Sequence, residues 1–217
     1  MHWNKKSLYL FLIVFFFSYS FYAGCSGQKT EPFVEVASID SSIVIDLRYA
    51  TPNNFTGQVL YNTPRCFLRK SVAERLERVQ KKLQKQGLGL KIWDGYRPLS
   101  VQKKMWALVP DSRYVANPKH GSRHNRGAAV DVTLVDSTGK ELHMPTGFDD
   151  FTLKAHRNWM GNDTLAIHNR QILEDAMTSE GFIPLSTEWW HFDAPNWKDY
   201  PIKNISIAEL IKKNRKN

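Results

Sequence analysis

His124 and Asp131 lie seven residues apart in the stretch SRHNRGAAVDVTL, residues 122–134. Imidazole and carboxylate groups are both zinc ligands. Asp131 stands among valines, and a buried carboxylate is costly unless it is paired or binds a metal. The residues Asn-Arg-Gly at 125–127 predict a turn, followed by a strand in which alternate residues face opposite sides. Ala128, Val130, Val132 and Leu134 would then fill the core, whereas Ala129, Asp131 and Thr133 would face a pocket.

Two ligands are only half of a zinc coordination sphere, and His191 is the best candidate for a third. It stands in EWWHFD, an aromatic segment that is predicted to be a strand, three residues after Glu188. On its own, a histidine in such a segment is equally well explained as a hydrogen-bonded core residue. The unexplained Glu188 and the incomplete metal site favour the ligand. His120 is close enough along the chain to compete with His124.

Three protein ligands leave a fourth zinc position for water, which is typical of a catalytic site. A carboxylate near the metal can take a proton from water and pass it to a leaving amine, and Glu188 is the candidate for this role. A fixed cation stabilises the oxyanion that forms, and Arg97 in WDGYRP stands at a predicted strand end. The alternative for Arg97 is a salt bridge to Asp94.

These motifs together resemble the D-alanyl-D-alanine dipeptidases of the vancomycin-resistance type, within the zinc peptidases of family M15. SRHNRGAAVDVTL matches the family pattern S-x-H-x-x-G-x-A-x-D, and EWWHF, WDGYRP and DLRYATPNNFTG (residues 46–57) resemble further family segments. The likeness runs from about residue 40 to about residue 195, which is nearly the whole predicted domain.

The resemblance implies a site for each step of dipeptide hydrolysis. One Zn²⁺ per chain would be held by His124, Asp131 and His191, with Glu188 as the general base and Arg97 stabilising the transition state. The substrate would be D-Ala-D-Ala or a related small peptide. Its free amino terminus would contact the polar groups of Tyr49, Ser122 and Asp149. Asp150 is adjacent to Asp149, Tyr49 could be a core residue, and Ser122 could cap a turn.

The predicted elements indicate an α+β domain, and the family fold implies a central antiparallel sheet flanked by helices. Helices are predicted at 70–87, 100–108 and 165–181, and strands at 41–51, 88–93, 128–134 and 187–193. In the first helix, Ser71 and Glu74 suggest a capping box. Strands and helices do not alternate regularly, which argues against a doubly wound sheet. We expect one domain over residues 35–217.

The first 24 residues are predicted to be a lipoprotein-type signal peptide. A basic start, MHWNKK, is followed by an apolar stretch too short for a membrane span and by AGC, in which Cys25 would be lipidated. Residues 25–34 would be a tether. An uncleaved anchor or a plain secretory signal are the alternatives, and all three place the domain in the bacterial envelope, outside the cytoplasm. Resistance-type dipeptidases act in the cytoplasm, so recovery of D-Ala-D-Ala during wall turnover suits this location.

The chain carries a formal charge of +9, and Lys5 and Lys6 of the signal account for two of these charges, which leaves +7. No basic stripe interleaved with aromatic residues is present, so we expect a solvated basic surface and no nucleic-acid partner. Besides Cys25 the chain has one cysteine, Cys66, which is expected to be a small packed residue. The sequence does not predict an oligomeric state.

Three other functions fit parts of the sequence. A zinc D,D-carboxypeptidase or endopeptidase that trims peptidoglycan peptides would share the metal site but need an open cleft. Ser100 and Lys103 match the S-x-x-K motif of penicillin-binding proteins, although no K-T-G follows. A lipoprotein that binds wall fragments without hydrolysis is the third alternative, and the presence of Glu188 and Arg97 argues against it.

Overall fold

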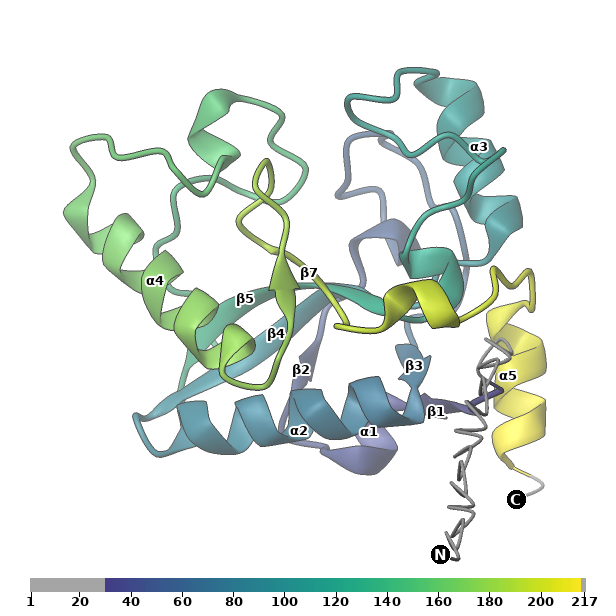
Figure 1. The fold of residues 1–217 in the computed structure, drawn as a ribbon, viewed down its shortest axis with the longest axis horizontal. Helices are drawn as coiled ribbons and strands as arrows, with labels where there is room; N and C mark the ends of the chain where they lie inside the picture. Colours follow the sequence, from purple (N-terminus) through teal and green to yellow (C-terminus); the bar gives the residue numbers. More distant parts are fainter. Residues whose placement is uncertain (1–29, 216–217) are drawn as a thin grey trace, which may run out of the picture.

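A five-stranded sheet forms the centre of the fold in the computed structural model, which describes residues 30–215 (Figure 1). Its strands, in spatial order, are β2 (Val44–Ile45), β4 (Leu88–Asp94), β5 (Ala129–Asp136), β7 (His191–Asp193) and β6 (Ile183–Pro184). All neighbouring strands are antiparallel except β2 and β4, which are parallel. The predicted α+β class with a mainly antiparallel central sheet is therefore confirmed.

Helices pack on this sheet and beside it. They are α1 (Val36–Ile39), α2 (Lys70–Gln84), α3 (Leu99–Leu108), α4 (Thr164–Thr178) and α5 (Ile207–Asn214). Figure 1 shows α2 running along one side of the sheet, with α4 and α3 towards opposite ends. The predicted apolar face of α2 is confirmed, because Val72, Leu76, Val79 and Leu83 are at most 1% exposed and belong to the main core.

The folded part begins before residue 35, where the sequence predicts its start. Phe33–Glu35 form β1, which pairs with β3 (Phe67–Arg69) in a separate two-stranded sheet, so the predicted tether to residue 34 is wrong at its end. Glu31 also contacts the domain, because its carboxylate accepts hydrogen bonds from the backbone N–H and hydroxyl of Ser71. A carboxylate near the first turn of a helix is favourable, and here Glu31 accepts from a backbone N–H of that turn. The predicted capping box is absent, and Arg69 occupies the N-cap position.

Two predicted strands are much shorter than expected. In residues 41–51 only Val44–Ile45 pair in the sheet, and Arg48–Ala50 form a 3-10 helix instead. In residues 187–193 only His191–Asp193 are a strand, and the residues before them form a turn. β-favouring side chains therefore did not fix the backbone conformation of these segments.

The predicted signal peptide and the lipidated Cys25 lie outside the described residues. Within residues 30–215, no helix combines the length and the apolar character needed to cross a membrane. Cys66 is 2% exposed and lies in the main core, as predicted for a packed residue.

Candidate active site

Three neighbouring strands bring acidic and imidazole side chains into one row. Asp131 of β5 lies opposite His191 of β7 and opposite Asp94 of β4. A register shift between Ile92 and Asp94 creates this row. Ile92 pairs with Val132, so unbroken alternation would direct Asp94 to the core face. The bulge instead places Asp94 on the same face as Asp131, which shows how a bulge can re-aim a side chain at a site.

A tight turn places His124 over this row. His124–Arg126 form a 3-10 helix that ends at Gly127, whose φ of +68° lies in the left-handed region. A Cβ at residue 127 would also lie 2.3 Å from the ring of Phe33, so glycine is required by conformation and by packing. The predicted turn before β5 is confirmed, and residues 128, 130, 132 and 134 lie in the core as expected.

The side chains of His124, Asp131 and His191 form a buried cluster whose donor atoms lie within 4.8 Å of one another. These three side chains are called the metal cluster below, because they could hold one metal ion. His124 Nε2 is 3.2 Å from His191 Nδ1, and Asp131 Oδ1 is 2.9 Å from His191 Nδ1. Each imidazole uses its other nitrogen to bond outward: His124 Nδ1 donates to the carbonyl of Gly95 and His191 Nε2 to Asp193, both at 2.9 Å. With a metal bound, the inward nitrogens would present lone pairs to it, and two imidazoles with one carboxylate are a donor set that fits zinc.

Asp193 completes the support of this cluster and was not identified from the sequence. Its carboxylate contacts His191 and also lies 3.0 Å from Nε of Arg123. Carboxylates that bond the outer nitrogen of a ligating histidine fix its orientation and raise its basicity. The signal was present in the spacing, because His191 and Asp193 are two residues apart and must share a strand face.

The electrostatics of the cluster favour a cation. Burial would lower the pKa of His191, but the carboxylates of Asp131 and Asp193 raise it to about 10. Burial would raise the pKa of Asp131, but His124 and His191 hold it well below its usual range. The site therefore stabilises a positive charge between buried carboxylates. A bound metal ion would supply such a charge.

Glu188 reaches the same site from the turn before β7. Its Oε2 lies 4.0 Å from Nδ1 of His191, and its side chain is partly buried. Residues three apart face opposite sides of a strand, so only the turn allows both side chains to face the metal cluster. Burial raises the pKa of Glu188. A carboxylate with a raised pKa beside a metal site is suited to accept and return a proton.

Arg97 follows β4 and is held rigidly. Its Nε donates to Asp94 at 3.0 Å, its Nη1 donates to Gln102 at 2.8 Å, and its guanidinium lies 4.7 Å from the centre of the Tyr49 ring. Burial would lower the pKa of Arg97, but Asp94, Tyr49 and Asp131 outweigh it and raise this pKa. The salt bridge to Asp94 considered as the alternative is present, and it positions a permanently charged group at the cavity.

Tyr49 and Asp149 form one end of the site. The Tyr49 hydroxyl donates to Asp149 at 3.0 Å, and Asp149 has a φ of +57°. Burial raises the pKa of Asp149 to about 7. Ser122 also lines the cavity, and its hydroxyl accepts from the backbone N–H of Asn125 at 3.3 Å. Ser122 therefore caps a turn, as the alternative proposed, and it also lies at the site.

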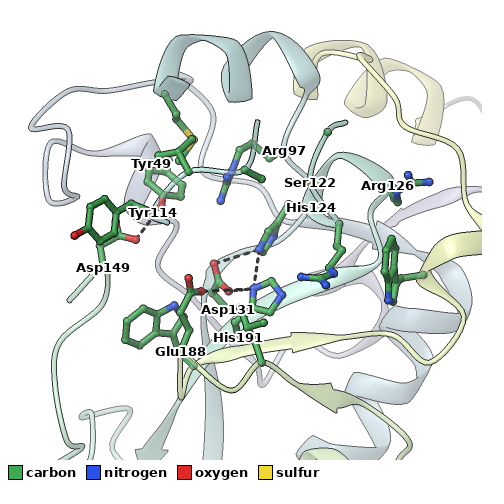
Figure 2. Close-up of a pocket in the computed structure, with 18 of the residues that line it drawn as sticks. Tyr49, Arg97, Tyr114, Ser122, His124, Arg126, Asp131, Asp149, Glu188 and His191 are labelled. Carbon is green, nitrogen blue, oxygen red and sulfur yellow. Dashed lines mark hydrogen bonds and ion pairs between the residues drawn. The ribbon is translucent and has the colours of Figure 1, made fainter. Parts of the chain in front are cut away.

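All eight predicted catalytic, metal and substrate residues line one cavity of about 350 Å³. Figure 2 shows Tyr49 and Asp149 on one side of the metal cluster and Arg126 on the other. His120 also lines the cavity but is exposed and lies outside the metal cluster, which resolves the competition in favour of His124. Ser100 and Lys103 are exposed on α3 and do not line the cavity, so the S-x-x-K alternative has no support from the structure.

The chain is similar to known D-alanyl-D-alanine dipeptidases. The sequence profile of Peptidase M15, described as D-Ala-D-Ala dipeptidase, matches residues 29–208. A D-alanyl-D-alanine dipeptidase of Escherichia coli (strain K12) is 38% identical over 175 residues, which cover 81% of this chain and 91% of that protein. One from Enterococcus faecium is 32% identical over 188 residues, covering 73% of this chain and 92% of that protein. Among solved structures, a vancomycin-resistance D,D-pentapeptidase, VanY, in complex with Zn(II) aligns with a TM-score of 0.40 and 17% identity, covering 61% of this chain and 75% of that chain.

Proposed function

This chain belongs to the D-alanyl-D-alanine dipeptidase family, Peptidase M15, and we propose that its cavity hydrolyses free D-Ala-D-Ala to two molecules of D-alanine. The activity is zinc-dependent, with His124, Asp131 and His191 as the metal ligands. The observation that carries the proposal is the buried metal cluster in a cavity that also holds Glu188, Arg97 and Asp149.

Each residue has a separate task in this reaction. Zinc, when bound, supplies a positive charge that acidifies water and polarises the peptide carbonyl. Glu188 accepts the proton of the attacking water and delivers it to the nitrogen of the leaving D-alanine. Arg97 stabilises the negative charge that develops on the carbonyl oxygen, and Asp94 and Gln102 hold it in place beforehand. Asp149 and Tyr49 bind the ammonium group of the first residue.

The cavity favours a dipeptide over a longer wall peptide. The rings of Tyr114 and Phe151 come from separate loops, both line the cavity, and their centroids are 4.5 Å apart. Figure 2 shows Tyr114 beside Asp149. A peptide with further residues before its terminal D-Ala-D-Ala would have to pass this aromatic contact at its amino-terminal side. A D,D-carboxypeptidase must admit such an extension, so the contact supports the dipeptidase over that alternative.

The test compares free D-Ala-D-Ala with its N-acetylated form under the same conditions. We expect the free dipeptide to be hydrolysed and the acetylated one to react at least about 100-fold more slowly, since acetylation removes the charge that Asp149 binds and adds bulk. Activity on the acetylated peptide alone would identify a carboxypeptidase. No hydrolysis of either peptide by the zinc-loaded protein would favour the binding-only alternative.

Asp149 should give substrate affinity a distinct pH dependence. With its pKa near 7, Asp149 is protonated below and ionised above that pH, so the KM of D-Ala-D-Ala should fall as pH rises from 6 to 7.5. Asp149→Asn should raise KM about 10-fold or more and abolish this fall. Asparagine tolerates the positive φ of this position, so the variant should fold.

Asp150→Asn is the matched control, because Asp150 does not line the cavity and accepts a hydrogen bond from the backbone of Thr152. It should keep the wild-type pH profile. A profile that is the same in Asp149→Asn and wild type would contradict the role of Asp149.

We also propose that the enzyme works in the bacterial envelope, attached through a lipid on Cys25. The support is the signal-like pattern of residues 1–24 and the small residues before Cys25. In that location it would recover D-alanine from dipeptide released during wall turnover. Cys25→Ala should abolish incorporation of labelled fatty acid and release the protein from membranes, and a variant that remains labelled would disprove the anchor.

A further inference from the structure

The two ends of the cavity carry opposite charges. Asp149 lies at one end, and Arg123 and Arg126 line the cavity with Trp197. In Figure 2, Arg126 and Asp149 lie on opposite sides of the metal cluster. A free dipeptide is a zwitterion, with an ammonium group at one end and a carboxylate at the other. The charge pattern of the cavity is therefore complementary to both ends of such a molecule.

We propose that Arg123 binds the free C-terminal carboxylate of the dipeptide, an inference that rests on the proposed function. Its Nε is paired with Asp193 Oδ2 at 3.0 Å, and its guanidinium lies 4.8 Å from the centre of the Trp197 ring. These contacts fix the plane of the guanidinium. Within residues 30–215, Nη1 and Nη2 of Arg123 donate no hydrogen bond to a protein acceptor. Two parallel N–H groups on a fixed guanidinium match the geometry of a carboxylate.

In each of the other two arginines at the cavity, at least one Nη group already donates to the protein. Arg97 donates to Asp94 and to Gln102, which aims it at the reacting carbonyl group. Arg126 donates through Nη1 to the backbone carbonyl of Tyr200, and its guanidinium lies 5.5 Å from the centre of the Trp197 ring. Arg123 is also accessible, with a side chain that is 36% exposed. Among the described residues, it is the arginine at the cavity whose two Nη groups are both free to bind a substrate group.

This role makes Arg123 a determinant of specificity. An enzyme that binds both termini accepts only peptides whose first and last residues are unblocked, and with the Tyr114–Phe151 contact this limits the substrate to a free dipeptide. Because Arg123 also pairs with Asp193, which contacts His191, a test must separate substrate binding from support of the metal site.

The experiment measures kcat/KM for D-Ala-D-Ala and for its C-terminal amide, with wild type, Arg123→Gln and Arg123→Lys. For the wild type we expect the amide to be about 10- to 100-fold poorer, the effect of one charge-assisted carboxylate contact. Arg123→Gln should lower kcat/KM for the acid by a similar factor, mainly through KM, and leave the amide and the zinc content unchanged. Arg123→Lys should restore part of the discrimination.

Arg78→Gln is the matched control, because Nε of Arg78 also pairs with a carboxylate, that of Glu180, and neither residue lines the cavity. It should behave as wild type with both substrates. Equal losses for acid and amide in Arg123→Gln, or a wild-type preference for the acid that survives this substitution, would overturn the role of Arg123. A wild type that hydrolyses neither substrate would overturn the proposed function itself, and the inference with it.

Discussion

Replacing Glu188 with glutamine is expected to lower kcat for D-Ala-D-Ala about 100- to 10,000-fold while the protein keeps its zinc. Glutamine has nearly the same size and shape but cannot accept the proton of the attacking water. Glu188 lies beside the metal cluster but is not one of its three members, so metal content should be unchanged. Steady-state kinetics and elemental analysis on the same preparation would measure both effects.

The matched control for Glu188→Gln is Glu77→Gln, which removes a partly exposed carboxylate paired with Lys81 on α2. This control should retain wild-type kinetics. Full activity in Glu188→Gln would mean that another group is the base. Loss of zinc from this variant would instead make Glu188 a ligand, and either result would refute the division of roles derived from the site geometry.

Replacing His191 with alanine is expected to remove zinc and activity together, and to destabilise the fold. His191 lies between Asp131 and Asp193, both buried, and its loss leaves these carboxylates without their shared partner. Removing one member of a buried charged pair costs about 3–5 kcal/mol of unfolding free energy. Metal content, D-alanine release and denaturant unfolding would measure the three effects.

His168→Ala provides the comparison, since His168 is exposed on α4 and does not line the cavity. It should differ little from wild type in all three measurements. A His191→Ala protein that binds zinc at full stoichiometry would contradict the ligand assignment. If the alanine variant unfolds, His191→Gln at low temperature keeps the test possible, because it fills most of the space and should still lose zinc.

The residues of the site could be predicted from sequence better than the elements that carry them. The turn and strand around Asp131 follow from Gly127 and the alternation of apolar residues, and the structure has both. Family resemblance or position predicts Tyr49, Asp149 and Arg97, and the structure brings all three to the cavity. Residue types that lie a few positions apart form a local pattern, and such a pattern can be identified in a single sequence.

The features that were missed depend on contacts between distant segments. The sequence predicts a tether where β1 lies, because these three residues form a strand only by pairing with β3. Phe33 is also buried against Gly127, far along the chain. The bulge that turns Asp94 towards the site depends on the register of β4 against β5. Glu188 was expected on a strand, but a turn brings it to the metal cluster. Pairing and register are tertiary properties, and local propensity does not determine them.

In the proposed reaction, this cavity hydrolyses D-Ala-D-Ala through a metal held by His124, Asp131 and His191. The most direct test is a panel of D-Ala-D-Ala, D-Ala-L-Ala and L-Ala-L-Ala, assayed on the purified domain as prepared, after treatment with a chelator, and after zinc is restored. We expect D-Ala-D-Ala to be the best substrate, its hydrolysis to disappear with the chelator, and zinc to restore it. Hydrolysis of D-Ala-D-Ala that persists in the metal-free protein would contradict the claim.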